Sequence, residues 1–222
     1  MMMKYNENGR SMVEMLGVLA IIGVLSVGGI AGYSKAMNKY KINKTTDQVS
    51  MLVANIRTLF SSQGNYKDLT NAQAIKFGVV PNDMYTPKSG SGEITEIKNA
   101  FNGQVYIAAS DGRAADDNEA FVIVYSGLTS EACVTIATGD WGSGQASGLI
   151  GIAAAGANST AAATAGAGAA IAGIYTTTAD GTDNVSIPGA TTLANRTPMT
   201  VSKAVEICNG SGSTNSVAWK YY

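Results

Sequence analysis

One acidic residue, Glu14, stands at the edge of a long apolar segment. From Met15 to Ser34 the sequence contains no charged residue, and this length is enough for a helix to cross a bilayer. A carboxylate in such a segment costs about 2.5–3.5 kcal/mol on membrane-insertion scales, so it indicates a function and requires a partner. The alternative is an acid close to the membrane surface whose carboxylate reaches the water.

Side chains for enzymatic chemistry are scarce. The chain has no histidine among its 222 residues, which removes the usual general base and the commonest metal ligand. We find no glycine-rich phosphate-binding loop and no set of catalytic residues. The net charge of −1 gives no general attraction to nucleic acid. The sequence therefore predicts a protein that is not an enzyme and holds no cofactor or metal.

The two cysteines are Cys133 and Cys208. Their spacing fits neither a redox CxxC pair nor a zinc ligand set. If the chain after the apolar segment is exported, we expect them to form a disulfide, which the chain-entropy relation values at about 4 kcal/mol. The alternative is two unpaired buried thiols in a cytosolic protein, which the apolar segment disfavours.

These residues need elements to position them, and the first is a long helix. Apolar residues at helical spacing continue past Lys35, now alternating with charged positions. The pattern predicts one helix over about 12–63, ended by Gly64. A short second helix is predicted between an N-cap at Thr70 and a stop at Gly78.

Strand-like runs and turn signals follow this helical part of the sequence. A long helix followed by strands predicts an α+β fold, with an antiparallel sheet packed on the amphipathic part of the helix. The predicted strands are Ile94–Lys98, Gln104–Ala108, Ala120–Tyr125, Cys133–Ala137 and Ser216–Tyr222.

The small residue suited to cleavage lies before the apolar segment, at Gly9, and not after it as in an ordinary secretory signal. The ordered set of Gly9, Arg10, Glu14 and about twenty apolar residues resembles the processing site and N-terminal helix of type IV pilins. The resemblance implies cleavage by a prepilin peptidase after Gly9 and N-methylation of the new terminus at Arg10. Arg10 departs from the Phe or Met that begins many mature members.

The resemblance also supplies a partner for Glu14. In a pilus, the α-amine of Arg10 of one subunit approaches Glu14 of its neighbour, and pairing offsets part of the cost of burying both charges. A wrong stagger leaves a buried unpaired carboxylate, so Glu14 would set the register between subunits. The guanidinium of Arg10 can compete for the same carboxylate.

Gly23 matches a glycine position of the family, and Ala31 stands where many members of one branch carry proline. Without that proline, any unwinding of the helix in a filament would rest on the glycines between 23 and 32. Small residues there also allow helices to approach closely in a bundle.

The later sequence resembles the type IVb branch of pilins in segments 99–107, 121–133 and 208–222. In that branch a disulfide ties the C-terminal region to the sheet, which implies the pairing of Cys133 with Cys208. The implied organisation is a leader over 1–9, a membrane or filament-core helix over 10–35, its amphipathic continuation over 36–63 and a globular head over 64–222.

Two segments of the head carry further hypotheses. Residues 141–179 have no charge and 153–173 are nearly all small, which predicts a flexible surface loop over about 141–182. A glycosylated face on the filament exterior is the functional alternative there. The acidic segment 111–119 is interpreted as a solvated hairpin loop, with a calcium site as the alternative.

The resemblance implies a major structural subunit of a type IVb-like pilus, made as a single-pass inner-membrane prepilin and polymerised into an extracellular filament. Its partners would be other copies of itself, the prepilin peptidase, and an assembly ATPase with its platform protein. A type II secretion pseudopilin and a membrane-tethered binding protein that never polymerises are the rivals. The role of the pilus in adhesion, aggregation, motility or DNA transfer stays open.

Overall fold

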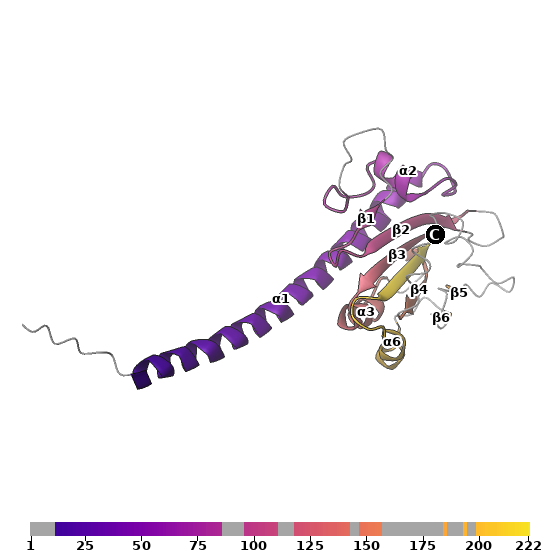
Figure 1. The fold of residues 1–222 in the computed structure, drawn as a ribbon. Coiled ribbons are helices and arrows are strands. Elements are labelled where there is room, and N and C mark those ends of the chain that lie inside the picture. The colour runs from indigo at the N-terminus through magenta and orange to yellow at the C-terminus, as the bar shows by residue number, and fades with distance from the viewer. Residues whose placement is uncertain are drawn as a thin grey trace, which may run out of the picture. The chain divides into compact units, whose positions relative to one another are not determined.

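The structure is a computed structural model that describes residues 12–85, 96–110, 118–142, 147–156, 184–185, 193–194 and 199–222. The chain divides into two compact units, Met1–Tyr40 and Lys41–Tyr222. The helix α1, Met12–Phe60, contributes residues to both units (Figure 1). We describe each unit by itself.

The long predicted helix is confirmed, and it ends slightly earlier than expected. Phe60 is the last residue of α1, and the N–H of Gln63 then donates to the Phe60 carbonyl in a turn at 2.9 Å. Gly64 follows with a φ of 71°, in the left-handed region that glycine adopts without steric cost. The predicted glycine stop is therefore present, separated from the helix by one turn.

The second unit is built on a five-stranded antiparallel sheet, as far as the described residues show, with strand order β1-β2-β3-β7-β4 (Figure 1). A separate pair, β5 and β6, is also antiparallel. The strands are β1 Ile97–Lys98, β2 Gln104–Ser110, β3 Ala120–Leu128, β4 Leu149–Ala155, β5 Asn184–Val185, β6 Leu193–Ala194 and β7 Asn215–Tyr221.

The main core lies between one face of this sheet and the amphipathic part of α1. Val49, Leu52 and Ile56 of α1 are fully buried and belong to one cluster with alternate residues of the strands, among them Ile123 and Trp219. Burying one such aliphatic side chain contributes about 1.5–3 kcal/mol. This packing confirms the predicted α+β class and places residues 42–60 of α1 against the sheet.

The opposite face of the sheet carries smaller side chains. The alternation of a strand sends Val122 and Val124 of β3 to this face while their neighbours enter the main core. The second cluster is Ala108, Val122, Val124, Ala153, Ala155 and Ala218. The alanines of β4 and β7 thus serve a buried face of the sheet.

The helix α2, Asn71–Lys76, begins as predicted. The Thr70 hydroxyl accepts from the N–H of Gln73 at 3.3 Å, and Gly78 has a φ of 71°. Asn71 then joins this helix to the sheet: its Nδ2 donates to the Val105 carbonyl at 2.9 Å and its Oδ1 accepts from the Ile107 N–H at 2.7 Å. One amide side chain therefore bonds two backbone groups of β2.

Replacing Asn71 by alanine should lower the free energy of unfolding by about 1–3 kcal/mol, because it removes two buried hydrogen bonds to β2, to the Val105 carbonyl and the Ile107 N–H. Denaturant unfolding followed by circular dichroism measures this loss. Asn43→Ala, at an exposed position of α1, is the matched control and should change stability by less than about 0.5 kcal/mol. Equal losses in the two variants would contradict this role for Asn71.

The prediction of a strand at Cys133–Ala137 is wrong, because these residues form the last part of the helix α3, Ser130–Ala137. The Thr129 hydroxyl caps the helix by accepting from the Ala132 N–H at 3.3 Å. The buried residues Ala132, Cys133, Ile136 and Ala137 repeat with helical spacing. Burial of this face outweighs the weak strand preference of the β-branched residues between them.

Four described elements were not predicted: β4, α6 and the short paired strands β5 and β6. Strand β4 lies within the segment 141–182 that we expected to be a loop, and all of its residues are buried. Its residues Ala153 and Ala155 belong to the second cluster, so the small side chains that we interpreted as a sign of a loop in fact pack on the sheet. The helix α6, Val201–Ile207, is capped by Thr200, whose hydroxyl accepts from the Lys203 N–H at 3.4 Å. Residues 157–182, to which the glycosylation hypothesis mainly applies, lie outside the described residues. Residues 111–117, which make up most of the segment of the calcium hypothesis, also lie outside them.

Candidate assembly site

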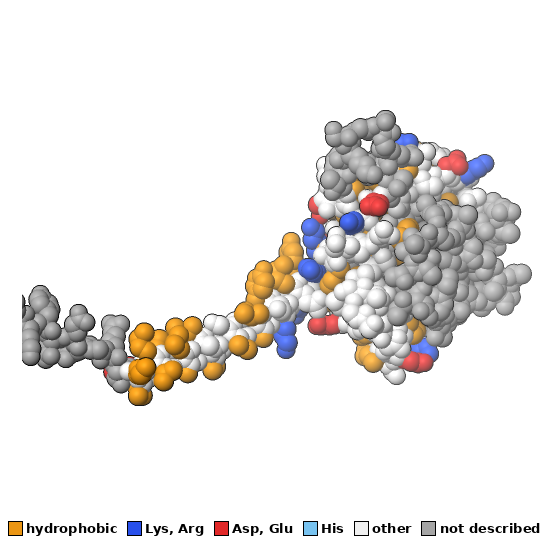
Figure 2. Space-filling model, in the orientation of Figure 1, with side chains coloured by type: hydrophobic (Ala, Val, Ile, Leu, Met, Phe, Trp, Pro, Cys, Tyr) orange, Lys and Arg blue, Asp and Glu red, His pale blue; other side chains and the backbone are white. Residues whose placement is uncertain are grey.

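The part of α1 in the first unit exposes nearly all of its apolar side chains (Figure 2). The exposed fractions of the large apolar residues there run from 51% at Met15 to 85% at Met12. Within the described residues, α1 is the one helix long and apolar enough to cross a membrane, with a mean hydropathy of 2.2 in its most apolar window. A surface of this kind requires lipid or protein to cover it.

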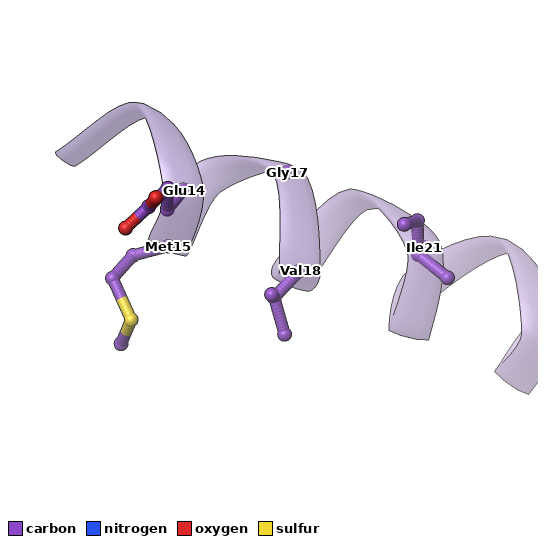
Figure 3. A pocket seen from close by; sticks show the side chains of 5 residues that line it. All are labelled: Glu14, Met15, Gly17, Val18 and Ile21. Atoms are coloured by element: carbon purple, nitrogen blue, oxygen red, sulfur yellow. The ribbon is translucent and has the colours of Figure 1, made fainter. Parts of the chain in front are cut away.

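Glu14 lies in the first turn of α1, where the positive end of the helix dipole favours a carboxylate. Together with Met15, Gly17, Val18 and Ile21 it lines a shallow hollow on the helix surface (Figure 3). In the part of the chain that the structure describes, Glu14 forms no ion pair. A single copy therefore presents a carboxylate inside an apolar surface and supplies no described cation for it.

Within the described residues, no neighbouring group requires glycine at these positions of α1. A Cβ added at Gly17, Gly23, Gly28, Gly29 or Gly32 would meet nothing within 4 Å. Each glycine costs up to about 1 kcal/mol against alanine inside a helix. A neighbour that packs closely on the backbone would offset this cost. The helix is continuous through Gly23 and Gly32, and its unwinding in a filament stays a prediction.

The remaining predicted site residues are the processing residues and the two cysteines. Gly9 and Arg10, the predicted processing residues, are outside the described residues. Cys133 and Cys208 form the predicted disulfide, with their Cα atoms 5.8 Å apart. The bond joins α3 to the residue that caps α6, so it fastens the segment before β7 to the segment after β3.

Arg57 has a structural role that the sequence interpretation missed. Its Nε and Nη2 donate to the main-chain oxygen of Tyr222 at 3.1 and 2.9 Å, and its guanidinium lies 5.1 Å from the ring centroid of Tyr221. Burial raises the pKa of Tyr221 to about 12, while the positive charge of Arg57 opposes the rise. Arg57 thereby fixes the end of β7 to α1. The sequence feature that could have indicated this role is the position of Arg57, a single arginine next to Ile56 in an otherwise apolar stripe of the helix.

Comparison with known proteins agrees with this architecture. A family model described as PilS N terminal matches residues 39–221. The toxin coregulated pilin of Vibrio cholerae is 28% identical over 135 residues, which cover 61% of this chain and 58% of that protein. The chain thus matches less than two thirds of the length of this relative.

Two further comparisons cover more of the molecule. The major structural subunit of the bundle-forming pilus of Escherichia coli is 24% identical over 222 residues, covering 98% of this chain and 96% of that protein. The crystal structure of a type IV b pilin from Salmonella typhi superimposes with a TM-score of 0.50 at 18% identity, covering 81% of this chain and 97% of that one. This structural likeness concerns the fold alone.

The family match spans most of the chain, and the long helix, the antiparallel sheet and the disulfide agree with it. The chain belongs to the PilS N-terminal family and is a type IVb-like pilin.

Proposed function

We propose that this chain is the structural subunit of a type IVb-like pilus and polymerises through the N-terminal part of α1. The observation that carries the proposal is the exposed apolar segment of α1, which ends in the Glu14 carboxylate, and this carboxylate forms no ion pair within the described residues. The second unit has its own buried core, so it needs no such segment to fold. A polymer in which these segments bundle would bury the apolar surface and use the glycines for close packing.

In this proposal Glu14 sets the axial register. The prepilin peptidase cleaves after Gly9, and the methylated α-amine of Arg10 pairs with Glu14 of the neighbouring subunit. The pair forms at the correct stagger, whereas other staggers bury a carboxylate alone, which is strongly unfavourable. The hollow beside Gly17 supports a close approach at this position.

The proposed life of the subunit has two stages. The apolar segment first anchors the prepilin in the inner membrane, and the assembly ATPase and its platform protein then move the subunit into an extracellular filament. The role is structural and not enzymatic. Electron microscopy of filaments sheared from the cell surface, with this chain identified in them, tests polymerisation. Their absence in an expressing strain would favour a membrane-tethered protein that does not polymerise.

The intact mass of the surface protein tests the processing. We expect a chain that begins at Arg10 and carries one additional methyl group, because Gly9 and Glu14 have the order that the peptidase requires in this family. Gly9→Leu should leave the leader on the protein, since a bulky side chain replaces the small residue at the cut. A surface protein that begins at Met1 would contradict the proposed processing.

A further inference from the structure

The far end of the apolar segment carries cations and aromatic rings. Lys35 and Lys39 are exposed and stand one turn apart on α1, so they share a face of the helix. Tyr33 and Tyr40 flank them with exposed fractions of 67% and 58%. Within the described residues neither lysine forms an ion pair. All four residues lie in the first unit.

The length of the helix fixes where these residues would lie in a bilayer. Between Glu14 and Lys35 the helix rises about 31 Å, which equals the thickness of a typical hydrocarbon core, about 30 Å. The anchored subunit would then hold Glu14 at one boundary of the hydrocarbon and Lys35 at the other. Tyr33 falls at this second boundary and Tyr40 just beyond it, where amphipathic rings are enriched.

The charge at this boundary has one sign. After Glu14 the next acidic residue is Asp47, whereas Lys35 and Lys39 come directly after the apolar segment. Two long cationic side chains at headgroup depth can extend to lipid phosphates while their methylene groups stay on apolar surface. A zwitterionic headgroup offers them a phosphate beside its own cation, and an anionic headgroup offers a net negative charge.

We propose that Lys35 and Lys39 bind the headgroups of anionic phospholipids and thereby select the lipids around the anchored subunit. This proposal rests on the membrane-anchored stage of the proposed function. Each lysine at the surface of an anionic membrane contributes an attraction that corresponds to about a fivefold preference. Tyr33 and Tyr40 hold the helix at the depth where these contacts form.

The test uses the full chain reconstituted in vesicles of phosphatidylcholine with phosphatidylglycerol. Spin-labelled phosphatidylglycerol and spin-labelled phosphatidylcholine, added to separate samples, report which lipid is motionally restricted at the protein surface. We expect the wild-type chain to prefer phosphatidylglycerol several-fold at low salt. In Lys35→Gln/Lys39→Gln the ratio should fall to near one, and about 1 M salt should reduce the wild-type preference in the same way.

Lys67→Gln/Lys98→Gln is the matched control, because it removes the same charge from exposed positions of the second unit. This variant should keep the wild-type preference. A chain that enters the vesicles with no preference, or an equal loss of preference in both double variants, would overturn the lipid proposal alone. A chain that fails to enter the vesicles at all would contradict the membrane anchor as well, and with it the anchored stage of the proposed function.

Discussion

Replacing Glu14 by alanine should reduce the yield of surface filaments at least about a hundredfold while the chain still inserts in the membrane. Removing one partner of a buried charge pair costs about 3–5 kcal/mol, because the other charge stays buried alone. In the proposed filament, the charge left behind would be the α-amine of Arg10 in the neighbouring subunit. The variant loses the discrimination between correct and incorrect staggers at the same time. Quantitative electron microscopy and immunoblotting of sheared filaments measure the yield.

Two variants make the Glu14 result specific. Glu14→Gln keeps the size of the side chain and removes its charge, so it should lose filaments nearly as severely as the alanine variant. Glu96→Ala removes a carboxylate from an exposed position of the second unit and should assemble normally. Membrane fractionation should recover all three variants with the wild-type chain. A normal filament yield from Glu14→Ala would refute the register role.

Removing the disulfide should lower the free energy of unfolding of the second unit by about 2–5 kcal/mol. Cys133 and Cys208 are 75 positions apart, so the bond closes a long loop that contains β4 and α6 and restricts the unfolded chain strongly. Denaturant unfolding of Cys133→Ser/Cys208→Ser in detergent, compared with the wild-type chain, measures the loss. The yield of surface filaments should also fall in this variant, because a smaller fraction of the subunit is folded.

A reducing agent supplies the control for the disulfide. Dithiothreitol should lower the unfolding midpoint of the wild-type chain and leave that of the double serine variant unchanged. If the double variant unfolds at the wild-type denaturant concentration, the bond does not contribute to stability and the expected loss is wrong.

Features that depend on the local sequence could be predicted. The long helix follows from continuous helical spacing, and the starts of α2 and β2 follow from a capping threonine and a strand pattern. The pilin class came from an ordered motif near the start of the sequence, and the type IVb branch came from the resemblance of segments 99–107, 121–133 and 208–222. The helix and strand signals need only neighbouring residues, and the class follows from a resemblance of sequence, so no tertiary contact had to be known.

Features that depend on distant partners could not be predicted. Residues 133–137 have a β-branched composition, and only burial of one face against the sheet makes α3 a helix. Strand β4 ends in three alanines, which locally predict no element, and its place beside β7 makes it a strand. The contacts of Arg57 with Tyr222 and of Asn71 with β2 join elements far apart in the sequence. No local pattern specifies such pairs.

The strand order has a consequence for the synthesis of the protein. Strand β7, the last described strand in the chain, lies between β3 and β4. Phe121 of β3, for example, pairs with Tyr221 of β7, a hundred positions later. Until β7 arrives, β3 and β4 each have an unpaired edge, which is prone to aggregation, and closing such distant contacts slows folding. A chain cut short before Asn215 cannot complete the sheet. The position of β7 thus selects against chains that lack it, since only a subunit translated through β7 can fold its head.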